Sequence, residues 1–152
     1  MILELKTFLL AMTPLGELRL SIPIALTSYQ LSVWSAYLIS VFGNIVPAIF
    51  ILLFLESFLK HVKEKSPFLH NFLNWVFVRN ENNHRKKFEY WKELALVILV
   101  AIPLPFTGAW TGAICSFIFR IPFKRAVPLI FLGVLIAGAL VTLFTLGILH
   151  LF

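Results

Sequence analysis

Two long uncharged apolar runs dominate the hydropathy pattern of the chain. They cover residues 31–55 and 126–149, which is 25 and 24 residues. A helix needs roughly 20 apolar residues to cross a hydrocarbon core about 30 Å thick. The pattern therefore predicts two transmembrane helices, over residues 31–59 and 126–150.

Two shorter apolar segments, 2–28 and 93–119, are each interrupted near the middle. The first is broken by Thr13-Pro14-Leu15-Gly16 and the second by Pro103-Leu104-Pro105. Their arms reach only ~16–20 Å at about 1.5 Å per residue, too short to cross. Irregular backbone at membrane depth survives only where protein buries it or where it lines a watery cavity. We therefore predict a re-entrant helical hairpin in each segment.

The polar middle, residues 60–92, reads as an amphipathic linker. Ser66-Pro67 is a favourable helix start, and the aromatic-rich stretch after it is interrupted by polar residues. This pattern is typical of a helix lying in the membrane interface. The basic run Arg85-Lys86-Lys87 beside Tyr90 and Trp91 predicts an interfacial anchor.

The order of elements repeats once: hairpin, long helix, linker, hairpin, long helix. With an offset of 90 residues Gly43 aligns with Gly133 and Ala36 with Ala126. If each half crosses once, the two halves are inverted. The predicted fold is an all-α integral membrane protein, a single domain over 1–152 with repeats at 1–59 and 93–152. Gly43, Asn44 and Pro47 further predict a kink or local unwinding in the first long helix.

Composition and charge support a membrane protein and give its orientation. The chain is 60% hydrophobic, with mean hydropathy +0.93 and net charge +6. Eleven of the 13 Lys and Arg residues lie in 60–92 and 120–125. Basic clusters beside membrane segments predict a cytoplasmic side and contacts with anionic lipids, so no nucleic-acid partner is expected. A rival arrangement with four full spans would place the 120–125 cluster outside.

Glu17 and Arg19 are the first candidates for chemistry, because a charge at membrane depth is costly and usually faces an interior cavity. A desolvated carboxyl holds a proton readily, and a guanidinium binds phosphate or carboxylate. Residues two apart on a helix do not face each other, so we expect each to meet a partner elsewhere. The alternative is a structural ion pair or helix capping by Glu17.

The breaks themselves supply further candidates. The backbone carbonyl and amide groups freed at the breaks, together with polar neighbours, would line a polar path. The predicted break residues are Pro14, Gly16, Pro23, Pro103, Pro105, Thr107, Gly108 and Gly112, and the predicted polar lining is Asn44 and Thr111. Packing is an alternative role for the GxxxG glycines 108 and 112, and helix capping for Asn44.

Arg120 and Arg125 would steer an anionic headgroup into a cavity. The alternative is that they only set the membrane topology and extend their charged ends to the membrane surface. The four histidines are scattered and a single cysteine forbids an internal disulfide, so we expect no metal and no cofactor. No nucleotide loop, catalytic triad or nucleophile–base pair is visible, which predicts that the chain is not an enzyme.

Pro14-x-x-Glu17-x-Arg19-x-x-Ile22-Pro23, with Pro103-Leu104-Pro105-x-Thr107-Gly108-x-x-x-Gly112, resembles the small multi-drug export protein family. That family is a relative of the DedA and VTT-domain membrane proteins. The resemblance implies two inverted repeats, each a hairpin plus a helix, and movement of drugs or lipids. An arginine pair of the DedA type is matched by Arg120 and Arg125, although Cys115 replaces the glycine of that motif. The second membrane acid associated with proton coupling has no clear counterpart.

We therefore expect a small inner-membrane transporter that moves an amphipathic anionic substrate, a lipid phosphate or phospholipid. Glu17, Arg19, Arg120 and Arg125 would form its substrate path, and proton coupling stays open. The alternatives are a proton-coupled exporter of cationic drugs and a non-transport scaffold. The expected partners are membrane lipids, the substrate, protons if coupling exists, and a second copy of the chain through Gly133, Ala137 and Gly138.

Overall fold

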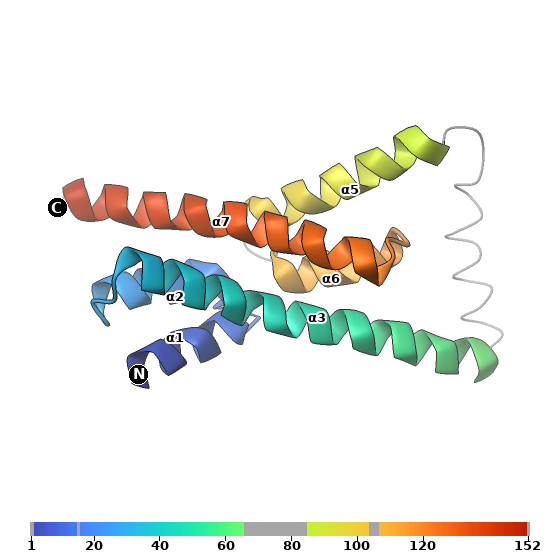
Figure 1. Ribbon diagram of the computed structural model, residues 1–152, viewed down its shortest axis with the longest axis horizontal. Coiled ribbons are helices and arrows are strands. Elements are labelled where there is room, and N and C mark those ends of the chain that lie inside the picture. The colour runs from blue at the N-terminus through green and yellow to red at the C-terminus, as the bar shows by residue number, and fades with distance from the viewer. Residues whose placement is uncertain (1, 15, 66–84, 104–106, 152) are drawn as a thin grey trace.

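The computed structural model describes residues 2–14, 16–65, 85–103 and 107–151, and every regular element in them is a helix (Figure 1). The six helices are α1 Ile2–Met12, α2 Glu17–Thr27, α3 Val33–Lys65, α5 Arg85–Ala101, α6 Ala109–Ile118 and α7 Phe123–Leu151.

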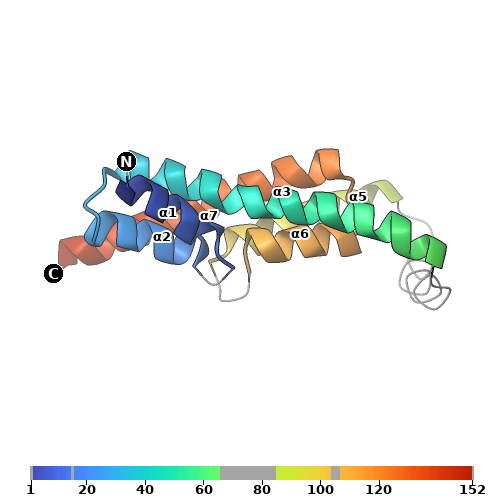
Figure 2. The ribbon, with the colours of Figure 1, turned by 90° about the horizontal axis from the view of Figure 1, so that it is seen from below.

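Helices α3 and α7 form the long axis of the molecule, where they lie side by side and run in opposite directions (Figures 1 and 2). The stretches Val33–Leu55 and Phe123–His150 are long and apolar enough to cross a membrane, which confirms the two predicted spanning helices. The helix α3 continues through Gly43, Asn44 and Pro47, so the predicted local unwinding is wrong, and the kink predicted as the other possibility stays a prediction.

The shorter helices form two folded-back pairs that lie beside the long helices. α1 and α2 occupy one half of the molecule, α5 and α6 the other, and both chain breaks lie near the middle of the long axis (Figures 1 and 2). The 11 residues of α1, the 11 of α2 and the 10 of α6 give each about 15–17 Å of length, which is half a hydrocarbon core.

The folding back of α5 and α6 decides where the second basic cluster lies. The α6–α7 turn at 119–122 returns to the end of the molecule where α3 ends and α5 begins (Figure 1). The α2–α3 turn, the N-terminus and the C-terminus lie at the opposite end.

Some boundaries differ from the prediction. α3 extends to Lys65 and α5 already begins at Arg85, so the two ends of the predicted 60–92 linker belong to these two helices. The predicted interfacial helix after Ser66-Pro67 lies outside the described residues. α5 is therefore 17 residues long, because its amphipathic basic start continues directly into the apolar arm.

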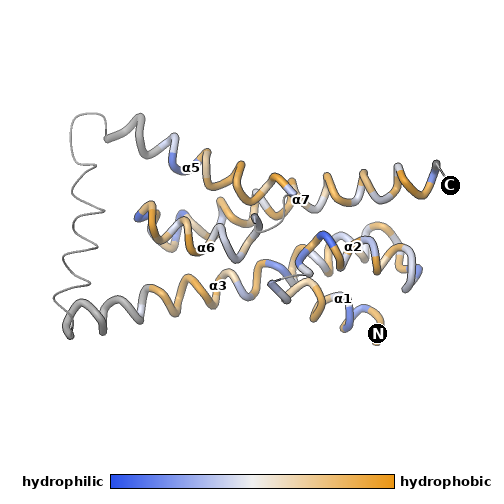
Figure 3. The backbone as a smooth tube through the Cα atoms, turned by 180° about the vertical axis from the view of Figure 1, so that it is seen from behind, coloured by the Kyte–Doolittle hydropathy of each residue, from blue (hydrophilic) through white to orange (hydrophobic). Residues whose placement is uncertain are grey.

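Large apolar side chains cover the outside of the long helices, and apolar positions line their length in Figure 3. Phe50 of α3 and Phe144 of α7 are 67% and 76% exposed. A water-soluble protein rarely exposes so much contiguous apolar surface. The exposed faces of α3 and α7 are therefore suited to lipid.

Glycines allow the helices to approach closely within the chain. A Cβ at Gly43 would lie 2.7 Å from the Phe8 carbonyl oxygen of α1, and one at Gly133 would lie 2.6 Å from Val100 Cβ of α5. Gly138 packs against the Tyr37 ring, and Ala137 is buried. The small residues predicted as a dimer face thus pack inside one chain in this structure, and their role in a dimer stays a prediction.

Gly43→Ala should lower the free energy of unfolding by about 1–3 kcal/mol, because the new methyl group meets backbone that cannot move aside. Gly147→Ala is the matched control: nothing lies within 4 Å of its Cβ, so the lower conformational entropy of Ala should slightly raise stability. The measurement is thermal unfolding of both variants in one detergent. Equal midpoints would contradict the close α1–α3 packing.

Candidate functional site

Glu17 reaches from the first break to the second helical pair. Its side chain is 8% exposed, and its carboxylate accepts a hydrogen bond from the backbone N–H of Trp110. Trp110 is the second residue of α6, whose first N–H groups have no partner within their own helix. Glu17 therefore caps α6 from another element, and the positive end of the α6 dipole stabilises its negative charge.

The backbone at both ends of this contact is specialised for it. Glu17 itself adopts a left-handed conformation with φ 42°, which a non-glycine residue rarely takes without a compensating interaction. Gly108, the residue before α6, lies so close to the Glu17 carboxylate that a Cβ there would overlap with it. Only glycine fits at position 108 while Glu17 caps α6.

Arg19 binds the oxygen atoms of the second break. Its Nη2 donates to the backbone carbonyl of Thr107 and, at 3.0 Å, to Thr107 Oγ1. The Thr107 hydroxyl in turn donates to the Ile102 carbonyl at 2.8 Å, which closes the break on itself. The carboxylate of Glu17 thus accepts from an N–H group, and the guanidinium of Arg19 donates to the carbonyl and the hydroxyl oxygen of Thr107. We call these contacts of Glu17 and Arg19 with residues 107–110 the clasp.

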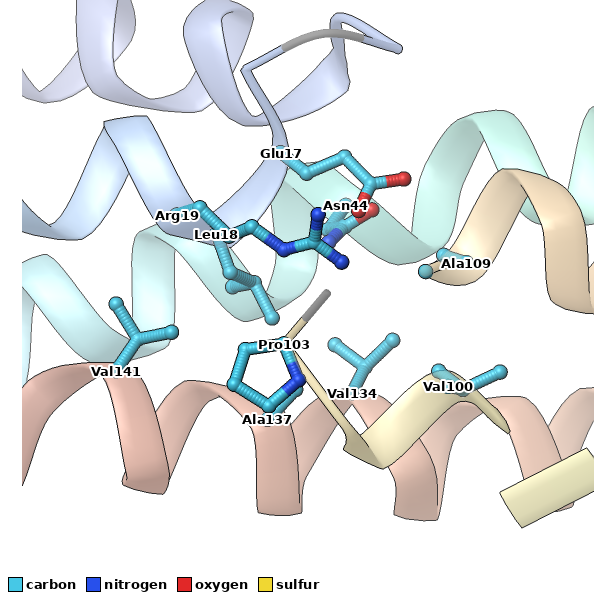
Figure 4. A pocket seen from close by; sticks show the side chains of 11 residues that line it. Glu17, Leu18, Arg19, Asn44, Val100, Pro103, Ala109, Val134, Ala137 and Val141 are labelled. Atoms are coloured by element: carbon cyan, nitrogen blue, oxygen red, sulfur yellow. The ribbon is translucent and has the colours of Figure 1, made fainter. Parts of the chain in front are cut away.

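The clasp borders a small cavity between the two helical pairs and the long helices (Figure 4). Its volume of about 10 Å³, counted for the centre of a water-sized sphere, leaves room for about one water molecule. One wall carries Glu17, Arg19 and Asn44, and the opposite wall is apolar. The lining residues are Glu17, Leu18, Arg19, Asn44, Val100, Pro103, Gly108, Ala109, Val134, Ala137 and Val141.

The charges of Glu17 and Arg19 attract each other across this region. As expected for residues two apart, each side chain takes its hydrogen-bond partners from another element. Asn44 of α3 is 1% exposed, and its Oδ1 has no hydrogen-bond partner within the described residues. The structure thus brings both charges of the first break and Asn44 to the second break.

Arg120 and Arg125 lie elsewhere. They follow the C-terminal end of α6, about 15 Å along that helix from the clasp. Arg125 Nη1 lies 3.4 Å from Glu93 Oε1 and its side chain is 61% exposed, whereas Arg120 is exposed and left-handed with φ 54°. The three candidate arginines therefore do not form one binding site in this conformation.

The other predicted break residues divide into two groups. Pro14, Gly16, Pro103, Thr107 and Gly108 lie in the breaks, and Pro105 lies outside the described residues. Pro23 lies inside α2, and Thr111 and Gly112 lie inside α6. Pro23 and Gly112 were therefore wrongly assigned to irregular backbone, and Gly112 packs against Val100. The role of Thr111 as polar lining stays a prediction.

Ser21 and Ser40 were missed by the sequence analysis. Both are fully buried, and neither hydroxyl has a hydrogen-bond partner within the described part of the chain. A signal was present: Ser21 follows Glu17 by four residues and Ser40 precedes Asn44 by four, so each shares a helix face with a candidate. Three or more metal-binding side chains do not cluster anywhere in the described ranges.

Residues 17–140 match the family model described as Putative small multi-drug export protein. The chain belongs to this family. The matched range begins at Glu17, directly after the first break. It includes the second break, the span Val33–Leu55, the basic turn at 119–122 and the first part of the span Phe123–His150. Together with the two candidate spans, the match indicates a membrane protein of an export family. No curated protein and no solved structure matches the chain.

Thr107→Val should destabilise this export-family protein by about 1–3 kcal/mol, because the Ile102 carbonyl and the Arg19 guanidinium both lose a partner. Thr107→Ser keeps the hydroxyl and should lie close to the wild type. Thermal unfolding of the three proteins in detergent measures the difference. If Val and Ser behaved alike, the hydroxyl would have no part in closing the break.

Proposed function

We propose that the protein is a small exporter that moves an amphipathic anionic substrate, a lipid phosphate or phospholipid, across the cell membrane at the clasp. The observation that carries the proposal is the meeting of two chain breaks midway along the spanning helices, closed by one carboxylate and one guanidinium. Charge and irregular backbone at membrane depth are costly, and proteins retain them mainly at transport sites.

The partners of Arg19 give a reason for an anionic substrate. Among the described residues, the guanidinium in the closed clasp donates its hydrogen bonds to the neutral oxygen atoms of Thr107. Hydrogen bonds from a guanidinium to a phosphate are roughly twice as strong as bonds to neutral acceptors. A phosphate headgroup can therefore displace Thr107 from Arg19, which opens the clasp and exposes the path.

The exposed basic surface at the α6–α7 turn also supports a negatively charged substrate. Arg120, Lys124 and Arg125 are all exposed there, at the end of the molecule that we place on the cytoplasmic side. They would concentrate anionic amphiphiles at that face rather than bind them at the clasp, since α6 separates the two places.

The two halves of the chain support a transport architecture of paired repeats, each a re-entrant hairpin and one spanning helix. α3 begins at Val33 and α7 at Phe123, and the left-handed residues Gln30 and Arg120 precede them; both pairs of numbers differ by 90. Because α3 and α7 run in opposite directions, such repeats would be inverted. Inverted repeats allow one half to rock against the other around a central site.

Export of a cationic drug is the second candidate, and one observation favours it. Glu17 is the one carboxylate buried among the described residues, so it is available as a counter-charge or proton carrier if the clasp opens. In that case the Trp110 N–H and Arg19 would compete with the substrate for the carboxylate.

Glu17→Gln and Arg19→Ala should each reduce transport at least tenfold, because one charge-assisted contact of the site is lost. The assay is purified protein in liposomes, with movement of a labelled polyprenyl phosphate and a labelled phospholipid between leaflets. Arg19→Ala should act more strongly, since it removes the phosphate-binding group itself.

Glu4→Gln and Lys6→Ala are the matched controls, because they make the same changes of charge near the start of α1, away from the clasp. They should transport normally. Wild-type uptake of a cationic dye driven by a proton gradient, without lipid movement, would instead select the cationic candidate. No movement of either substrate by the wild type would overturn the transporter assignment and favour a scaffold.

A further inference from the structure

We infer that α2 and α3 contain a closed water pathway to Glu17, formed by Ser21, Ser40 and Asn44. We call these three residues the polar track. The inference concerns how water reaches the proposed transport site. Only the purpose of the pathway rests on the proposed function, because the pathway itself is a property of the helix packing.

The first observation is three buried polar groups without hydrogen-bond partners among the described residues, on two helices that pack against each other. Ser21, Ser40 and Asn44 are at most 1% exposed, and Ser21 Oγ, Ser40 Oγ and Asn44 Oδ1 have no hydrogen-bond partner in the described residues. Buried polar atoms without partners are rare in native proteins, and each one calls for an explanation. A partner supplied in a second conformation is such an explanation.

The second observation is the alignment of these groups. α2 and α3 pack side by side, are joined by the turn at 28–32, and run in opposite directions (Figure 1). Glu17 and Asn44 line the same cavity, so they lie at one level. Ser21 is one helical turn beyond Glu17 and Ser40 is one turn before Asn44, which brings the serines to one common level.

The track continues toward the membrane surface through small residues. One turn further along each helix are Ala25 and Ala36, both fully buried, and the turn at 28–32 follows. Because the side chains on both helices are small here, few atoms have to move if the helices separate by the diameter of a water molecule. The pathway would therefore open at the end of the molecule that carries the N- and C-termini.

The chemistry of the cavity walls favours water on this side only. Toward α5 and α7 the cavity is lined by Val100, Val134, Ala137 and Val141, which offer no hydrogen bonds. Toward α2 and α3 it is lined by Asn44 and the charges of the clasp. Water would satisfy the hydroxyl groups and the amide oxygen together, because one molecule both donates and accepts.

The clasp is the element that keeps the track closed. Glu17 and Arg19 fix the start of α2 to residues 107–110, and Ser21 lies on the same helix face as Glu17. Release of Glu17 from α6 frees the start of α2 to move away from α3. Gly108→Ala should cause this release without changing any charge, because its Cβ takes the space of the carboxylate.

Cysteine labelling tests the pathway directly. The chain has one native cysteine, so Cys115→Ser gives a clean background for Ser21→Cys and Ser40→Cys. Each variant is reconstituted in liposomes and treated with a charged, water-soluble methanethiosulfonate. With Gly108→Ala added, labelling at both positions should rise at least tenfold, the effect of losing one charge-assisted hydrogen bond. Ala113→Cys, fully buried in α6, is the control and should stay unlabelled.

Two outcomes would overturn the inference. If labelling at the serine positions does not rise, the track is only close packing. If Ala113→Cys rises equally, Gly108→Ala has loosened the whole protein. Glu17→Gln serves as a second opener if Gly108→Ala does not fold, because it removes the charge and adds no atom. Labelling needs no transport, so a track that opens in a protein without transport activity would refute the proposed function and not the pathway.

Discussion

The structure depends on satisfying backbone groups where two chain breaks meet among apolar helices. Hydrocarbon offers no hydrogen bonds, so the free N–H groups of α6 and the carbonyls before it need partners from the protein. Glu17 supplies an acceptor and Arg19 a donor, each with a full charge. Because the two charges also attract each other, neither is left uncompensated in a buried place. The same contacts join the two halves of the chain.

This double role links stability to function. A clasp made of two charged side chains and neutral backbone groups is strong enough to close the structure. Under the proposed function it is also replaceable, since a phosphate or a proton would compete for the same atoms. The left-handed backbone at Glu17 and the required glycine at 108 indicate that the closed form is specifically built. The oxygens of Ser21, Ser40 and Asn44 have no partner among the described residues, which is the basis for the inferred second, open form.

The close approach of the helices serves the same arrangement. Gly43 lets α1 contact α3, and Gly133 lets α5 contact α7, so each folded-back pair is held against a long helix. The breaks are consequently positioned by packing on both sides. The small residues Gly133, Ala137 and Gly138 are buried by this packing within the single chain.

The sequence by itself determined the class of protein, the two long apolar helices, the positions of both breaks and the expectation that Glu17 and Arg19 take partners from another element. These features follow from local signals in the sequence: a long uninterrupted apolar run, proline and glycine inside an apolar run, and a charge at membrane depth. Each signal can be recognised without knowing which other residues it contacts. Only the tertiary structure decided that Glu17 caps α6, that Arg19 binds Thr107, that Pro23 stays helical and that Arg120 and Arg125 lie apart from the clasp. Those facts depend on which helices lie side by side, and the spacing of residues along one chain does not contain that information.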